Sequence, residues 1–162
     1  MFIYVARHAW AYQYGDERWP DDSQRPLEEA GRERYALVVG KLAEIGFAPD
    51  LIATSPYARC VQTAEVIAAE TPRNPQIVTL DELAPGSDFE ALIAWTRSVE
   101  ADAVCWVGHA PDVSFLCGEL IGCRAANIRF AKGAVAAVRA FEEPGGGCGE
   151  LYWLATAKSL GI

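Results

Sequence analysis

The sequence predicts an α/β protein, a three-layer α/β/α sandwich around a mostly parallel mixed sheet of about five to six strands. Short apolar runs alternate with segments whose apolar residues recur at helical spacing, a pattern typical of parallel strands covered by helices. Near the end of the chain, two apolar runs flank the glycine-rich segment 144–149, which indicates an antiparallel hairpin. A chain of 162 residues without repeats or linkers fits one domain, 1–162, with a substantial core.

The first part of the chain predicts a strand, a long loop and a helix. Phe2–Ala6 is apolar and predicts the strand. Residues 9–26 are polar and aromatic, with several Gly and Pro, and predict a loop of the kind that often carries function. The helix extends from about Glu28 to Ile45, and Gly46 supplies its end. Its apolar residues recur at helical spacing: Tyr35, Val38, Leu42 and Ile45.

A second strand and a second helix follow. Asp50–Thr54 predicts the strand. Ser55 and Pro56 have the chemistry of an N-cap and of a first helical position, so a helix is expected to begin there and to extend to about Glu70. Gln76–Leu80 predicts a third, weaker strand.

The second half continues the alternation and then changes character. Asp88–Val99 predicts a helix that packs Phe89, Leu92, Ile93 and Trp95. Ala103–Val107 predicts a strand buried on both faces, because it lacks polar alternation. A helix is expected to begin near Pro111 and to pack Val113, Phe115, Leu116 and Leu120. Residues 133–141 and 151–155 then predict the two strands of the hairpin.

The bulk composition excludes several classes of function. The net charge of −8 argues against nucleic-acid binding, which depends on Lys and Arg contacts to phosphate. No apolar stretch approaches the ~18 residues that span a bilayer. Arg7 interrupts a very short apolar N-terminal run, unlike a signal peptide. We therefore expect a cytoplasmic protein that does not bind membranes, in which an anionic substrate needs a local cluster of cations.

The spacing of cysteine and histidine argues against disulfides and metal sites. The five cysteines form no CxxC pair and are odd in number, so reduced thiols are expected. The two histidines have no closely spaced Cys or carboxylate partners. A zinc site is therefore a weaker alternative, because no recognisable set of ligands is present.

Both histidines follow predicted strands. His8 comes directly after Arg7 at the end of the first strand, and His109 follows the strand 103–107. In open α/β sheets, ligands bind beside the carboxyl ends of the strands. Arg59 lies about one turn into the helix after the second strand, where the helix N-terminus also favours an anion. The fold is therefore expected to gather two guanidinium groups and two imidazoles in one small volume.

Such a cluster suits phosphoryl chemistry. Guanidinium groups match phosphate oxygens in bidentate geometry, and nearby arginines favour the neutral, nucleophilic form of an imidazole. Each residue also has a simpler interpretation, in which His8 is a structural histidine and Arg59 a surface arginine. The complete set favours a histidine nucleophile held among phosphate-binding cations.

Five sequence blocks resemble, in order, those of the histidine phosphatase (phosphoglycerate-mutase-like) superfamily, and within it the small SixA-type phosphohistidine phosphatases. The blocks are Arg7-His8-Ala9; Arg25-Pro26-Leu27 with Gly31; Ser55 to Arg59 with Gln62-Thr63-Ala64; Glu82-Leu83 with Pro85-Gly86; and Gly108-His109 with Pro111. The resemblance covers nearly the whole chain. Two positions depart from the usual pattern. Ala9 replaces a glycine, and Glu28 stands where a Thr would offer an N-cap hydroxyl.

The resemblance implies a role for each site residue. His8 would attack phosphorus and become transiently phosphorylated, while Arg7, Arg59 and His109 hold the phosphoryl oxygens, with His109 acting best when protonated. Arg25 would add a phosphate contact, or would be a solvated loop arginine. The family chemistry requires no metal or organic cofactor.

The family resemblance also implies that Glu82 is the candidate proton donor to the leaving group. A pocket that excludes water would raise its pKa enough to keep it protonated. The alternatives are that Glu82 is a solvated loop carboxylate, or that the neighbouring Asp81 is the acid.

Three functions follow from these residues. The first is hydrolysis of phosphohistidine in a protein partner, which the shortness of the chain favours because it suggests an open site. The second is hydrolysis of a small phosphorylated metabolite at the same site, favoured by a closed pocket with extra cations. The third is a non-catalytic phosphate-binding or regulatory module, which the presence of all four central residues opposes.

Overall fold

The sheet contains six strands, four of them parallel. The computed structural model, which describes residues 1–162, places the strands in the order β3-β2-β4-β1-β5-β6. Their bounds are β1 Phe2–Arg7, β2 Leu51–Thr54, β3 Gln76–Thr79, β4 Ala103–Gly108, β5 Val135–Ala140 and β6 Gly149–Ala155. The first four strands pair in parallel, while β5 pairs antiparallel with β1 and with β6. The mixed, mostly parallel sheet and the terminal hairpin are confirmed.

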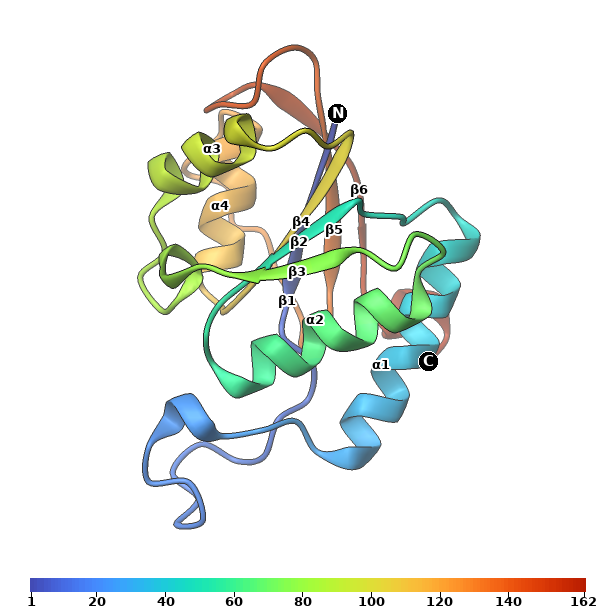
Figure 1. The fold of residues 1–162 in the computed structure, drawn as a ribbon, viewed down its shortest axis with the longest axis vertical. Helices are drawn as coiled ribbons and strands as arrows, with labels where there is room; N and C mark the ends of the chain where they lie inside the picture. Colours follow the sequence, from blue (N-terminus) through green and yellow to red (C-terminus); the bar gives the residue numbers. More distant parts are fainter.

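Helices cover both faces of this sheet (Figure 1). Their bounds are α1 Glu29–Glu44, α2 Ala58–Glu70, α3 Phe89–Ser98 and α4 Asp112–Leu120. Tyr4 and Ala6 of β1 pack in a core with α1 and α2, whereas Ile3 and Val5 pack in a second core with α3 and α4. This alternation along one strand divides the interior into two apolar layers and confirms the three-layer sandwich.

The central strand β4 is buried along its whole length, as its unbroken apolar sequence predicted. Trp106 faces the layer of α3 and α4, and its Nε1 donates to Thr96 Oγ1 at 3.2 Å. The one polar atom of this large buried side chain is thereby satisfied.

The carboxyl ends of β1, β4 and β2 meet at one edge of the sheet. Arg7 pairs with Gly108, and Thr54 pairs with Val107. The backbone pairing continues one residue past the strands, since the N–H of His8 donates to Gly108 O at 3.0 Å. The three segments that carry the candidate residues therefore emerge side by side.

The start of α2 differs from the sequence expectation. The helix begins at Ala58, and its N-cap is Tyr57, whose side chain makes no capping bond. The prediction of Ser55 as N-cap and Pro56 as first helical residue is therefore wrong by two positions. The physical reason is that the Ser55 hydroxyl is held by His109, with 2.8 Å between Oγ and Nε2.

Phe115 is a second correction. It was expected in the core, but it lies 45% exposed on the outer side of α4. The inward positions of that helix are filled by Val113, Leu116 and Leu120. Position 115 precedes 116 by about 100° around a helix, so it lies off the core-facing stripe.

The loop 9–26 is irregular, as predicted, but it is fastened to the domain. It contains a short 3₁₀ helix, η1 (Asp22–Gln24), and an isolated bridge between Ala11 and Leu27. Two further 3₁₀ turns are η2 (Asp81–Leu83) and η3 (Lys158–Leu160). None of the helices has the length and apolar character that crossing a membrane would require.

Gly31 shows how closely the loop approaches α1. A Cβ at this position would lie 2.5 Å from Trp10 O and 2.7 Å from Trp10 Cβ. A Cβ at Gly40 of the same helix would meet nothing within 4 Å.

We predict that Gly31→Ala lowers the free energy of unfolding by about 1–3 kcal/mol, because loop backbone must move to relieve the overlap. Gly40→Ala is the matched control and should raise it by about 0.5–1 kcal/mol through helix propensity. Urea denaturation followed by circular dichroism measures both. Equal effects of the two substitutions would contradict the close approach of loop and helix.

Candidate active site

Two imidazoles and a guanidinium gather where β1, β2 and β4 end. The ring centroids of His8 and His109 lie 5.5 Å apart. His8, Arg59 and His109 are 7%, 4% and 5% exposed, so this is a buried cluster reached from one edge of the sheet. The structure therefore brings together three of the predicted residues from distant parts of the chain.

The hydrogen bond of His8 determines its tautomer. Nδ1 lies 2.8 Å from the carbonyl oxygen of Ala9, which can only accept, so Nδ1 carries the proton. Burial, followed by the charges of Arg59 and His109, outweighs this bond and lowers the pKa of His8 to about 3. Near neutral pH the ring is uncharged, and its Nε2 has a free lone pair.

His109 is also neutral, with the opposite tautomer. Its Nδ1 lies 3.3 Å from Arg59 Nη2, and a guanidinium can only donate, so Nδ1 accepts. Nε2 therefore carries the proton and donates to Ser55 Oγ at 2.8 Å. Burial and the charge of Arg59 lower the pKa of His109 to about 4. A phosphoryl dianion placed beside the ring would act in the opposite direction and favour the protonated form.

Asp22 of the loop connects two arginines. Its Oδ2 lies 3.0 Å from Arg59 Nη2, and its Oδ1 accepts from Arg25 Nε at 2.7 Å. Burial raises the pKa of Asp22, but hydrogen bonds and charge from both arginines outweigh burial and hold it below its ordinary value. Sequence reasoning missed Asp22. Its position three residues before Arg25 was the available signal.

Arg25 is buried in the loop and fixed by it. Its Nη1 donates to Tyr12 O at 2.7 Å, in addition to the bond from its Nε to Asp22. Its charge contributes to the lowered pKa of His109, which places it within electrostatic range of that imidazole. Arg25 is therefore part of the cationic surroundings of the cluster rather than a solvated loop residue.

Two site arginines have unused donors. The Nε atoms of Arg7 and Arg59 are buried and have no hydrogen-bond partner. Arg7 is held by a bond from Nη1 to Phe130 O at 2.8 Å. Because buried polar groups are normally paired, two unpaired guanidinium N–H groups indicate capacity for an anion.

Two polar residues of α2 fasten the chain around His8. Thr63 Oγ1 accepts from Ala9 N at 3.0 Å and donates to Arg59 O at 2.6 Å. Gln62 Oε1 accepts from Leu27 N at 2.7 Å. Sequence reasoning had assigned no role to either residue.

Glu82 lies in η2, beside the end of β4. The neighbouring Leu83 lies beside Gly108, the residue before His109. A Cβ added to that glycine would lie 3.7 Å from Leu83 Cδ2. Glu82 is half-buried and its side chain forms no hydrogen bond or ion pair, whereas Asp81 is exposed. Of the two carboxylates, Glu82 is the less exposed.

Neither metal ligands nor a second nucleophile accompany the cluster. No three His, Cys, Asp or Glu side chains converge as a metal site would need. All five cysteines are free, and Cys60 Sγ lies 3.5 Å from His109 Nε2. Burial raises the pKa of Cys60 to about 12, so its thiol stays protonated and unreactive.

Known proteins resemble this chain in sequence and in structure. Residues 3–121 match the family described as the histidine phosphatase superfamily (branch 1). An uncharacterized protein of Picosynechococcus sp. is 38% identical over 117 residues, which cover 70% of this chain and 68% of that protein. The protein histidine phosphatase SixA, solved with tungstate, superposes with a TM-score of 0.84 at 25% identity over 99% of both chains. The alpha-ribazole phosphatase of Shigella flexneri shares the fold, with a TM-score of 0.70 and 16% identity over 97% of both chains.

Proposed function

This phosphatase belongs to the histidine phosphatase superfamily, and we propose that it hydrolyses its substrate through a covalent phosphohistidine on His8. The observation that carries the proposal is the free lone pair on Nε2 of a neutral, buried His8 beside Arg59 and His109. A nucleophile must be unprotonated at working pH, and a pKa of about 3 ensures this.

The reaction proceeds in two displacements. In the first, Nε2 of His8 forms a bond to phosphorus while the bond from phosphorus to the leaving group breaks, and the leaving group takes a proton from Glu82. In the second, water attacks phosphorus and the phosphorus–nitrogen bond breaks. Inorganic phosphate leaves, and Glu82 recovers its proton from the attacking water.

The surrounding cations stabilise the charge that spreads over the phosphoryl oxygens. Arg7 and Arg59 offer their unpaired Nε–H groups, and His109 supplies a further donor once it is protonated beside the dianion. Asp22 keeps Arg59 and Arg25 in a fixed orientation, so little reorganisation is needed when the substrate binds.

The preferred substrate is phosphohistidine in a protein. The likeness to SixA over nearly the whole of both chains supports this choice. A small phosphorylated metabolite is the second candidate, and one observation favours it: Arg129 and Lys132 line a pocket that also contains Arg7.

We expect kcat/KM to be highest for a phosphohistidine-carrying phosphotransfer protein, when compared with sugar phosphates and nucleotides in a phosphate-release assay. Imidazole bound to phosphorus is already an activated leaving group, which an open site can process without enclosing it. A clear preference for one of the metabolites would reject the protein substrate and leave the covalent mechanism intact.

Replacing His8 or Arg59 tests the mechanism itself. His8→Ala should abolish turnover of p-nitrophenyl phosphate, and Arg59→Ala should lower kcat by about 100-fold or more through loss of a transition-state donor. Acid-labile, base-stable phosphate should be trapped on the wild type but not on His8→Ala. Near-normal turnover by either variant would refute its assigned role. If wild type and His8→Ala are equally inactive while phosphate still binds, the chain is a phosphate-binding module.

Replacing Glu82 separates an acid from a bystander. Glu82→Gln should lower kcat by about 100-fold for an alkyl phosphate, whose alkoxide leaving group needs a proton. The loss should be much smaller for p-nitrophenyl phosphate, whose leaving group departs as an anion. Asp81→Asn is the matched control. A loss that is the same for both substrates would show that Glu82 is not the proton donor.

A further inference from the structure

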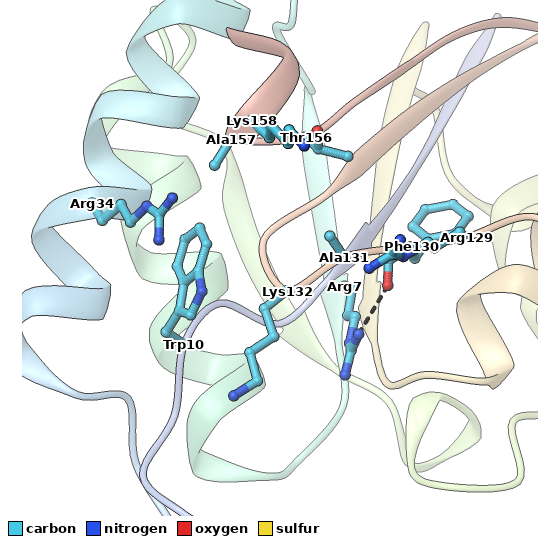
Figure 2. A pocket seen from close by; sticks show the side chains of 10 residues that line it. All are labelled: Arg7, Trp10, Arg34, Arg129, Phe130, Ala131, Lys132, Thr156, Ala157 and Lys158. Atoms are coloured by element: carbon cyan, nitrogen blue, oxygen red, sulfur yellow. Dashed lines mark hydrogen bonds between the residues drawn. The ribbon is translucent and has the colours of Figure 1, made fainter. Parts of the chain in front are cut away.

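A pocket of about 490 Å³ is lined in part by Arg7, the residue before His8. Five cationic side chains line it: Arg7, Arg34, Arg129, Lys132 and Lys158. They come from β1, from α1, from the segment 129–132 before β5, and from η3 (Figure 2). We call this surface the basic pocket. It contains no Asp or Glu.

The Lys and Arg side chains that have no carboxylate partner gather at the basic pocket. Eight of the fourteen Lys and Arg side chains form ion pairs with carboxylates. Five of the other six line the basic pocket, and the sixth is Arg139 on β5. In a chain with 22 acidic residues and a net charge of −8, the cations without an Asp or Glu partner are therefore concentrated at one place. Two of them bond to backbone oxygens instead, Arg7 to Phe130 O and Arg34 to Ile162 O, at 2.8 and 2.9 Å.

Physical chemistry favours an anion at such a place. Cations held together repel one another, and an anion between them removes the repulsion and gains charge-assisted hydrogen bonds. In Figure 2 the Lys132 side chain lies between Trp10 and Arg7. Arg34 stacks on Trp10, with 4.4 Å between its Cζ and the ring centroid, which holds that cation at the rim.

Arg7 links the basic pocket to the catalytic cluster, because it lines the pocket and directly precedes His8 in the chain. Its bond to Phe130 O ties the segment 129–132 to the guanidinium. A group bound in the pocket would therefore be adjacent to the phosphoryl group that His8 attacks. The volume lies within the range of about 300–1,000 Å³ that is typical of small-ligand sites.

We propose that the basic pocket binds a second anionic group of the same substrate, a group that is not hydrolysed. This inference rests on the proposed function, because it assumes that the scissile phosphoryl group lies beside Arg7. The second anion is either another phosphate of a small molecule or a carboxylate side chain near the phosphohistidine of a protein.

Matched sugar phosphates test the small-molecule source. The ratio of KM for fructose 6-phosphate to KM for fructose 1,6-bisphosphate measures the contribution of the second phosphate. Where a sugar is not turned over, its Ki against p-nitrophenyl phosphate replaces KM. Arg129→Ala should reduce this ratio about fivefold, the loss expected for one partly solvated charge-assisted contact. Arg139→Ala removes another exposed arginine that has no carboxylate partner and lies outside the pocket, and should leave the ratio unchanged.

A phosphohistidine-carrying phosphotransfer protein tests the other source. The KM values of Arg129→Ala and Arg139→Ala are compared on this phosphotransfer substrate and on a second form of it, in which the acidic residues flanking the phosphorylated histidine are changed to amides. A rise in KM that is specific to Arg129→Ala and to the acidic form assigns the pocket to carboxylates, whereas an effect limited to fructose 1,6-bisphosphate assigns it to phosphate. If Arg129→Ala and Arg139→Ala behave alike on every substrate, the inference is overturned. The His8→Ala result decides the proposed function separately.

Discussion

The register of three parallel strands determines the geometry of the whole site. β1, β4 and β2 are paired so that Arg7, Gly108 and Thr54 end at the same edge, and the residues that follow must emerge as neighbours. A slip of one residue in either pairing would exchange the two faces of a strand and separate the imidazoles. The slip is opposed by both apolar layers at once, because β4 is buried on each face. The core of the protein therefore also aligns its chemistry.

Electrostatic balance in the cluster follows from this crowding. Burial and neighbouring arginines keep both imidazoles neutral, which is what a nucleophile needs and the reverse of what a phosphate-binding cation needs. Asp22 partly offsets the two arginines by pairing with both of them. Elsewhere the cations are paired with carboxylates, apart from those in the basic pocket and Arg139. A strongly acidic protein thus presents one positively charged region, and that region adjoins its nucleophile.

The sequence predicted the layers and the central residues because both depend on periodic or ordered patterns. Apolar periodicity located each helix and strand to within about three residues, and strand ends indicated where His8 and His109 would meet. The start of α2 was missed because the Ser55 hydroxyl bonds to His109, a partner 54 residues away. Asp22 and Thr63 were missed because their partners are also distant in the sequence. Asp22 of the loop pairs with Arg59 of α2, and Thr63 of α2 accepts from Ala9 N, just after β1. The basic pocket could not be predicted, because its cations come from four separate segments with no shared spacing.

The tautomer of His109 has a consequence for the order of events during binding. Nε2 is committed to Ser55, so a proton taken up from solvent must go to Nδ1, the atom that now accepts from Arg59 Nη2. Protonation would convert that acceptor into a donor and release one guanidinium N–H at the same moment. A single proton would therefore add two donors to the cavity. The arriving anion would itself promote this rearrangement, making capture of the ligand cooperative with charging of the ring.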